Sequence, residues 1–149
     1  MSLLEPPAEL PKKSYAWKIA VIAVALFVII ALLFNFRYYP EKKAASQFFA
    51  TLAAGDTAKA YALWKPTSSY AMKDFLADWG PDGYYGPVRS YKIMTTKAVR
   101  NSSSIEVNVA ISPFTPMPQP ADGEKSMKTK VVTIWVTPAD KSLTFPVPY

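Results

Sequence analysis

An uninterrupted run of sixteen apolar residues, Ile19 to Phe34, constrains this chain more than any other feature. Apolar character extends to Ala16 and Phe36 with only two polar interruptions. At 1.5 Å per residue, a helix from Ala16 to Phe36 covers about 30 Å, the thickness of the hydrocarbon core of a bilayer. A chain of 149 residues has no remaining segment that would cover such a helix on every side. We therefore predict a transmembrane helix, residues 16–36, and not a buried core helix.

A cleavable signal peptide is the alternative, since Lys12, Lys13 and Lys18 precede or enter the apolar run. The run is followed by the bulky stretch NFRYYP, where a signal peptidase needs small residues, so an uncleaved signal anchor is predicted. Aromatic and basic side chains suit the two membrane interfaces: Trp17, Lys18, Phe36, Arg37, Tyr38 and Tyr39.

The orientation of the anchor is not decided by charge, because basic residues flank both ends of the apolar run equally. A short tail, residues 1–15, and a long C-terminal part, residues 37–149, favour a cytoplasmic N-terminus and an extracytoplasmic domain. The expected location is the cell inner membrane, with a periplasmic domain.

Three short amphipathic helices are predicted between Pro40 and Gly80. Apolar side chains of the first recur at helical spacing before Gly55: Ala45, Phe48, Phe49 and Leu52. Asp56 is placed to cap the second helix, whose stripe is Ala60, Leu63 and Trp64. Ser69 is placed to cap the third, whose stripe is Met72, Phe75, Leu76 and Trp79. The pattern does not recur further along, so a helical repeat protein is excluded.

From residue 88 onward the hydrophobic period changes from 3.6 to two, which predicts strands. The first predicted strand is Val88–Val99, with these residues expected on one face: Tyr91, Ile93, Thr95 and Val99. It is predicted to form a hairpin with a second strand, whose alternating apolar residues are Ile105, Val107, Val109 and Ile111. Lys130–Thr137 is apolar on both faces and is expected to lie centrally.

The last predicted strand, Leu143–Tyr149, carries prolines two residues apart, Pro146 and Pro148. Both lack an N–H group and would leave the same edge of the strand without donors. We expect an edge strand, with Leu143, Phe145 and Val147 facing the helices.

The predicted fold is α+β: one transmembrane helix, then three helices packed on a curved antiparallel sheet of about four strands. The stretch ASQFFATLAAGDTAKAYALW, residues 45–64, and the order of elements resemble the nuclear transport factor two-like superfamily, which has a cystatin-like cone. The resemblance covers about residues 41–149 and implies the membrane-anchored bacterial type. This superfamily includes enzymes, ligand binders and assembly modules, so the resemblance does not select a function.

Composition argues against catalysis, because the chain has neither histidine nor cysteine. Asp74 and Asp78 share a helical face but are expected to face solvent. We expect no catalytic residues, no metal and no cofactor. The net charge of +6 suggests nucleic acid, but the basic residues form no run, so a lipid surface is the better explanation of the excess.

Two loops are the candidate contact surfaces. The loop GPDGYYGPV, residues 80–88, presents Tyr84 and Tyr85, and exposed tyrosines favour protein interfaces. The proline-rich segment 112–126 is predicted to be a long loop, either a docking arm or a tolerated insertion, with these contact candidates: Phe114, Pro116, Met117 and Pro118.

Four aromatic residues are alternatively candidates to line a ligand pocket in the cone, although core packing would also use them: Tyr61, Trp64, Trp79 and Trp135. The expected function is therefore non-catalytic: a single-pass subunit or assembly factor of a membrane protein complex, with the lipid bilayer and other membrane proteins as partners. The alternative is a periplasmic binder of a small apolar ligand.

Overall fold

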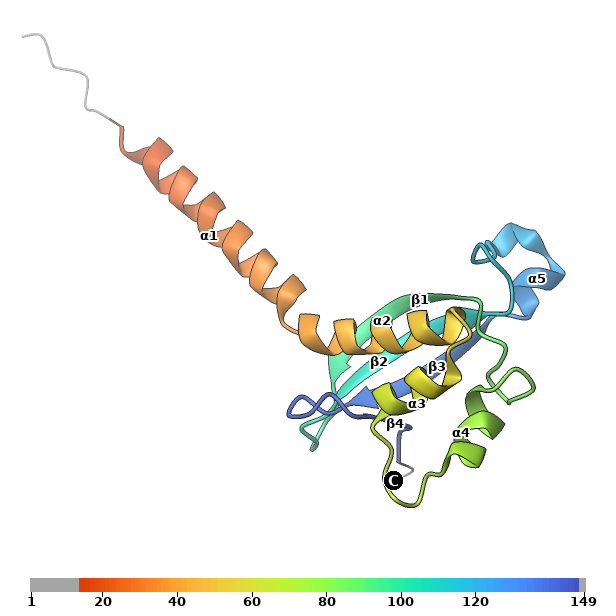
Figure 1. Cartoon of the computed structure of the whole chain (residues 1–149). Helices are drawn as coiled ribbons and strands as arrows, with labels where there is room; N and C mark the ends of the chain where they lie inside the picture. Colours follow the sequence, from red (N-terminus) through yellow and green to blue (C-terminus); the bar gives the residue numbers. More distant parts are fainter. Residues whose placement is uncertain (1–13, 148–149) are drawn as a thin grey trace, which may run out of the picture. The chain divides into compact units, whose positions relative to one another are not determined.

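The computed structural model describes residues 14–147, and the chain divides into two compact units between Arg37 and Tyr38. The first unit contains helix α1, Ala16–Phe36 (Figure 1). This helix is long and apolar enough to cross a membrane, and none of its residues is buried. The predicted helix is confirmed. The predicted N-terminal tail lies largely outside the described residues.

The second unit begins with three helices: α2, Tyr39–Ala53; α3, Thr57–Trp64; and α4, Met72–Trp79. Gly55, with a φ of +81°, allows the turn that separates α2 from α3. The Asp56 carboxylate accepts a hydrogen bond from the Lys59 backbone N–H at 3.0 Å, which confirms the predicted cap.

The predicted cap of α4 is wrong. The helix begins after Ala71, whose N–H donates to the Asp74 carboxylate, while the Ser69 hydroxyl contacts the Thr67 hydroxyl. The apolar stripe of α4 is also narrower than predicted, because Leu76 is 39% exposed.

Four antiparallel strands form a curved, open sheet in the order β1-β2-β3-β4. Their bounds are β1, Ser90–Ala98; β2, Ile105–Ser112; β3, Lys130–Val136; and β4, Leu143–Thr144. The hairpin of β1 and β2 is confirmed, with Ser90 opposite Ser112 and Ala98 opposite Ile105. The inner position of β3, between β2 and β4, is confirmed as well.

An irregularity in β1 changes which residues face the helices. The register shifts between Ile93 and Thr95, which leaves Met94 without an opposite residue. Thr95 therefore pairs with Asn108 and turns away from the core, contrary to the prediction, while Thr96 pairs with the buried Val107.

Strand β4 lies at the edge of the sheet, as predicted, but it is shorter than the predicted segment. Pairing with β3 ends at Thr144, because Pro146 has no N–H to continue it. Leu143 is buried and Phe145 packs on the core, whereas Val147 is 60% exposed and does not face the helices.

The core lies between the helices and one face of the sheet, and α2 crosses that face (Figure 1). Aromatic rings dominate its helical side, where Phe48 lies 5.0–6.2 Å from four other rings: Phe49, Trp64, Phe75 and Trp79. The alternating apolar residues of β2 and β3 complete it. Such edge-to-face packing fills the interior with large side chains.

The segment that links β2 and β3 was predicted to be an extended loop, and this is only partly correct. It contains a 3₁₀ turn, η1, Pro120–Asp122, and one short helix, α5, Glu124–Met127. We call residues 113–129 the arm. In Figure 1 the arm lies at the opposite end of the domain from the first residues of α2.

Candidate functional site

The loop that carries the paired tyrosines is folded tightly onto the end of α4. Tyr84 and Tyr85 donate backbone hydrogen bonds to the carbonyls of Ala77 and Asp78, at 2.9 and 2.8 Å. A side chain at Gly86 would overlap the backbone carbonyl of Gly80, so only glycine fits this close approach. The loop is therefore held by its own backbone and presents its side chains in defined positions.

The two tyrosines have different surroundings. Tyr85 is half-buried and stacks on Trp79, with ring centroids 4.9 Å apart, and on Phe145 at 5.7 Å. Burial, followed by the nearby Tyr84 and Asp78, raises the pKa of the Tyr85 phenol. Tyr84 is 70% exposed. Of the predicted pair, Tyr84 is thus the surface residue and Tyr85 belongs mainly to the core.

The first part of the arm is attached to the beginning of β1. The Ser90 hydroxyl donates to the Phe114 carbonyl at 2.6 Å, and the Thr115 hydroxyl donates to the Arg89 carbonyl at 3.1 Å. Met117 lies within 3.8 Å of the same Ser90 hydroxyl. Of the predicted arm contacts, Phe114, Met117 and Pro118 are half-buried, while Pro116 is exposed.

The arm and the tyrosine loop meet around a surface cleft of about 350 Å³. We call it the distal cleft, and its lining residues are Tyr85, Gly86, Pro87, Ile111, Ser112, Pro113, Met127, Lys128 and Lys130. Lys130, the first residue of β3 after the arm, contacts the tyrosine loop: its ammonium group donates to the Tyr84 carbonyl and lies 4.8 Å from the Tyr84 ring centroid. Met127 is 85% exposed at the rim.

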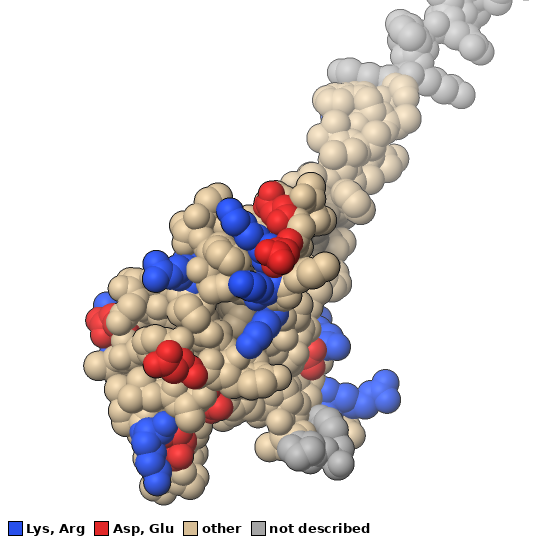
Figure 2. All heavy atoms as spheres, turned by 90° about the vertical axis from the view of Figure 1, so that its right-hand side faces the viewer, with Lys and Arg blue, Asp and Glu red and all other residues tan. Residues whose placement is uncertain are grey.

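Basic side chains surround the distal cleft. The ammonium groups of Lys125 and Lys128 lie 5.8 and 5.9 Å from the centroid of the Phe114 ring. Among residues 14–147 the ion pairs are Lys97–Glu106 and Lys141–Glu41, so these lysines form no ion pair with a described carboxylate. Figure 2 looks onto the end of the domain that carries α5, where basic side chains gather with acidic ones beside them.

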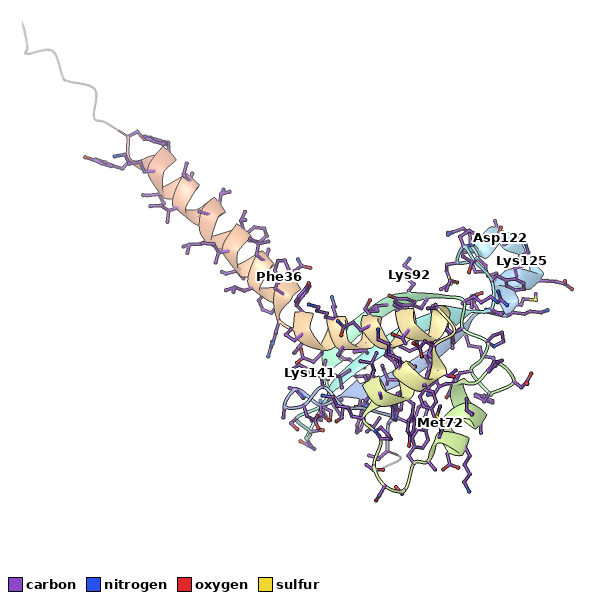
Figure 3. All side chains as sticks on the ribbon, in the orientation of Figure 1. Phe36, Met72, Lys92, Asp122, Lys125 and Lys141 are labelled. Carbon is purple, nitrogen blue, oxygen red and sulfur yellow. The ribbon has the colours of Figure 1, made fainter. Side chains whose placement is uncertain are left out.

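The end of the domain where α2 begins is organised differently, and we call it the proximal end. Glu41, in the first turn of α2, is buried and accepts from the Lys141 ammonium at 2.9 Å. Lys141 also donates to the Pro138 carbonyl, and Lys65 donates to the Asp140 carbonyl. Figure 3 shows Lys141 at this end and Lys125 at the other.

The four predicted pocket residues do not share one cavity. Trp64 and Trp79 are buried in the core, and Tyr61 packs against Phe75 with centroids 5.4 Å apart. Trp135 pairs with Glu106 and Thr144, so its side chain lies on the opposite face of the sheet from the helices. The three core aromatics thus serve as packing residues, and Trp135 is buried separately.

The acidic residues of α4 are partly buried and have structural partners, which corrects the prediction that they face solvent. Asp74 accepts from the N–H of Ala71, and Asp78 accepts from the Tyr70 hydroxyl at 2.6 Å. Burial first, and then the contact with Asp78, raises the pKa of the Tyr70 phenol. Within residues 14–147, acidic side chains form no group of three that could hold a metal ion.

The predicted interfacial residues fall on both sides of the boundary between the two units. Trp17, Lys18 and Phe36 are exposed on α1, and Arg37 follows it. Tyr38 packs partly against the core of the domain, whereas Tyr39 is exposed at the start of α2.

Comparisons with protein-family models, with curated proteins and with solved structures gave no match. The resemblance to the nuclear transport factor two-like superfamily therefore stays a prediction.

The sequence reasoning did not identify Met127, Lys128 and Lys130 as neighbours of the tyrosine loop. The lysines were visible as a basic cluster before a strand, but Lys130 lies 46 residues from Tyr84 along the chain. Only the pairing of β2 with β3, which returns the chain to the same end of the sheet, brings them together.

Proposed function

We propose that this chain is a single-pass membrane protein whose C-terminal domain works by contact, as a subunit or assembly factor of a membrane protein complex. The observation that carries the proposal is the distal cleft, which is lined by the exposed Met127 and by two lysines without an ion pair, Lys128 and Lys130. The exposed Tyr84 lies beside it, in contact with Lys130. Tyrosine and methionine are enriched in protein interfaces. The proposed function needs no chemistry and no cofactor.

Helix α1 is the proposed anchor. Apart from Lys18 and Asn35 near its ends, its side chains are apolar on all sides, and none is buried, so a bilayer is the environment that would cover them. We propose that the N-terminus is cytoplasmic and that the domain is periplasmic at the inner membrane. Replacement of Ala25 by Arg at the middle of the helix should weaken membrane insertion by about 2.5–3.5 kcal/mol. Retention of the Ala25→Arg variant in membranes after alkaline extraction would contradict this assignment.

The contact function is tested by replacing the exposed Met127 at the distal cleft and the exposed Tyr84 beside it. The Tyr84→Ser, Met127→Ser variant should fold like the parent, because both side chains are exposed, but should lose its membrane neighbours after gentle detergent extraction. A matched control is Leu76→Ser, Met94→Ser, which removes exposed apolar side chains elsewhere on the domain. Equal co-purification of neighbours with both variants would contradict the proposal.

A further inference from the structure

Apart from its two lysines, the lining of the distal cleft is largely apolar, with the buried Ser112 as its polar exception. Its apolar lining residues include Ile111, which is buried, Tyr85, which is half-buried, and Pro87 and Pro113. Its volume of about 350 Å³ lies at the lower end of the range for ligand pockets. The cleft therefore has room for one large side chain of a partner, but not for a folded element.

The rim of the cleft is basic, and the structure orients its charges. Lys130 is held by the carbonyl and ring of Tyr84, and Lys128 lies over Phe114. A cation–π contact orients an ammonium group without neutralising its charge. Because the ion pairs among residues 14–147 lie elsewhere, the rim is complementary to carboxylates from outside the chain.

The composition of the rim favours a protein over a lipid surface. Membrane surfaces are recognised by clusters of about four to eight basic residues. Here three lysines share the arm and its end with two exposed acidic residues, Asp122 and Glu124. The exposed Tyr84 and Met127 add the side chains that protein interfaces use.

We infer that the distal cleft binds an acidic segment of a protein partner, with one apolar side chain in the cleft and its carboxylates on Lys128 and Lys130. This inference rests on the proposed function, because it names the chemistry of the partner at the same surface. An extended segment suits the cleft, since acidic residues on both sides of one apolar residue would reach both lysines.

The test uses the full chain in nanodiscs of phosphatidylcholine and fluorescent peptides as probes. The peptide Glu-Glu-Phe-Glu-Glu should bind, and replacement of its Phe by Gly should weaken binding, because the cleft would then stay empty. The Lys128→Glu, Lys130→Glu variant should lose about tenfold or more in affinity for the acidic peptide and should bind Lys-Lys-Phe-Lys-Lys instead. The matched control Lys59→Glu, Lys73→Glu reverses the same number of charges at exposed positions on α3 and α4.

A single substitution serves as a control for disruption of the tyrosine loop by the double variant. Lys130 contacts that loop, but the Lys128 ammonium takes part in none of the hydrogen bonds found among residues 14–147. Lys128→Glu alone should therefore keep the circular dichroism spectrum of the parent and still weaken binding of the acidic peptide. Unchanged affinity in Lys128→Glu and in the double variant would overturn the inference.

Acetylation of lysines, measured by mass spectrometry, distinguishes binding of an acidic protein segment from binding of an anionic lipid surface. The acidic peptide should protect Lys128 and Lys130 from acetylation, while addition of phosphatidylglycerol to the nanodiscs should not. Protection by phosphatidylglycerol without protection by the peptide would overturn the inference in favour of a membrane surface.

The inference and the proposed function fail in different ways. If Tyr84→Ser, Met127→Ser loses its neighbours while the charge-reversed variant keeps both neighbours and peptide binding, the contact function stands and the acidic partner is wrong. The opposite outcome is that the neighbours remain bound to Tyr84→Ser, Met127→Ser, although Lys128→Glu, Lys130→Glu loses affinity for the acidic peptide and gains it for the basic one. In that case the contact function is wrong and the acidic specificity of the cleft stands.

Discussion

The two ends of the domain differ in how their lysines are paired. At the proximal end, Lys141 is paired with the buried Glu41, and Lys65 binds a backbone carbonyl of the same loop. At the distal cleft, Lys128 and Lys130 contact aromatic rings and no described carboxylate. Among the described residues, the proximal end thus holds one lysine–carboxylate pair, whereas the lysines of the distal cleft form none and can pair with a carboxylate of a partner.

Helix α2 separates these two ends. Its fifteen residues span about 22 Å. Glu41 in its first turn pairs with Lys141, and its last residue, Ala53, lines a cleft together with residues 87–89. Since the apolar helix joins the domain at the start of α2, the distal cleft lies at the end of α2 farther from that junction. Residues within each end differ in burial and in pairing, so mutations at them should change the free energy of unfolding to different extents.

The largest expected difference is between the adjacent tyrosines. Tyr85→Ala should lower the free energy of unfolding by about 2 kcal/mol, roughly half the cost of truncating a fully buried aromatic side chain, because the Tyr85 ring packs on Trp79 and Phe145. Tyr84→Ala should change it by less than about 0.5 kcal/mol, since that side chain is exposed. Denaturant unfolding followed by tryptophan fluorescence measures both, and equal losses would remove the distinction between core and contact tyrosine.

A somewhat smaller effect is expected from Glu41→Ala at the proximal end. The variant leaves the Lys141 ammonium without its carboxylate and should cost about 1–2 kcal/mol, because Lys141 is partly exposed and can regain water. Lys97→Ala, which breaks the more exposed pair with Glu106, should cost less than about 0.5 kcal/mol. Thermal unfolding of the two variants checks the order, and a larger loss for Lys97→Ala would contradict it.

The smallest effect is a loss of stability in alkali. Burial raises the pKa values of Tyr70 and Tyr85 above the usual 10.0, so the folded domain keeps these phenols protonated where the unfolded chain ionises. Their contribution is fully present below pH 10 and is lost as the pH rises above it. The free energy of unfolding of the Tyr70→Phe, Tyr85→Phe variant should fall less between pH 9 and pH 11, and a parallel fall in parent and variant would contradict this account.

Much of the fold follows from local patterns that the sequence displays. The apolar run, the Gly55–Asp56 break and the alternation of β2 each depend on neighbouring residues only, and each prediction is confirmed. Errors arose where a tertiary contact decides. The irregularity at Met94 turns Thr95 outward, and Asp74 takes the capping role predicted for Ser69.

The candidate site was predictable in its parts but not as a whole. The tyrosine pair and the proline-rich arm were identified from loop composition, but not which tyrosine is exposed. The burial of Tyr85 depends on Trp79 and Phe145, which approach it only in the folded domain. The basic rim likewise depends on the return of β3 beside β2. Local sequence patterns do not show which residues far apart in the chain become neighbours in the fold.

The most direct test of the contact function places one photo-crosslinking amino acid at each end of the domain in the full chain. Tyr84 reports on the distal cleft, and the exposed Ala139, in the loop of Lys141, reports on the proximal end. The account predicts a discrete crosslinked membrane protein from position 84, lost in the Lys128→Glu, Lys130→Glu background, and none from position 139. Crosslinking from position 139 alone, or equal crosslinking from both positions, would contradict it.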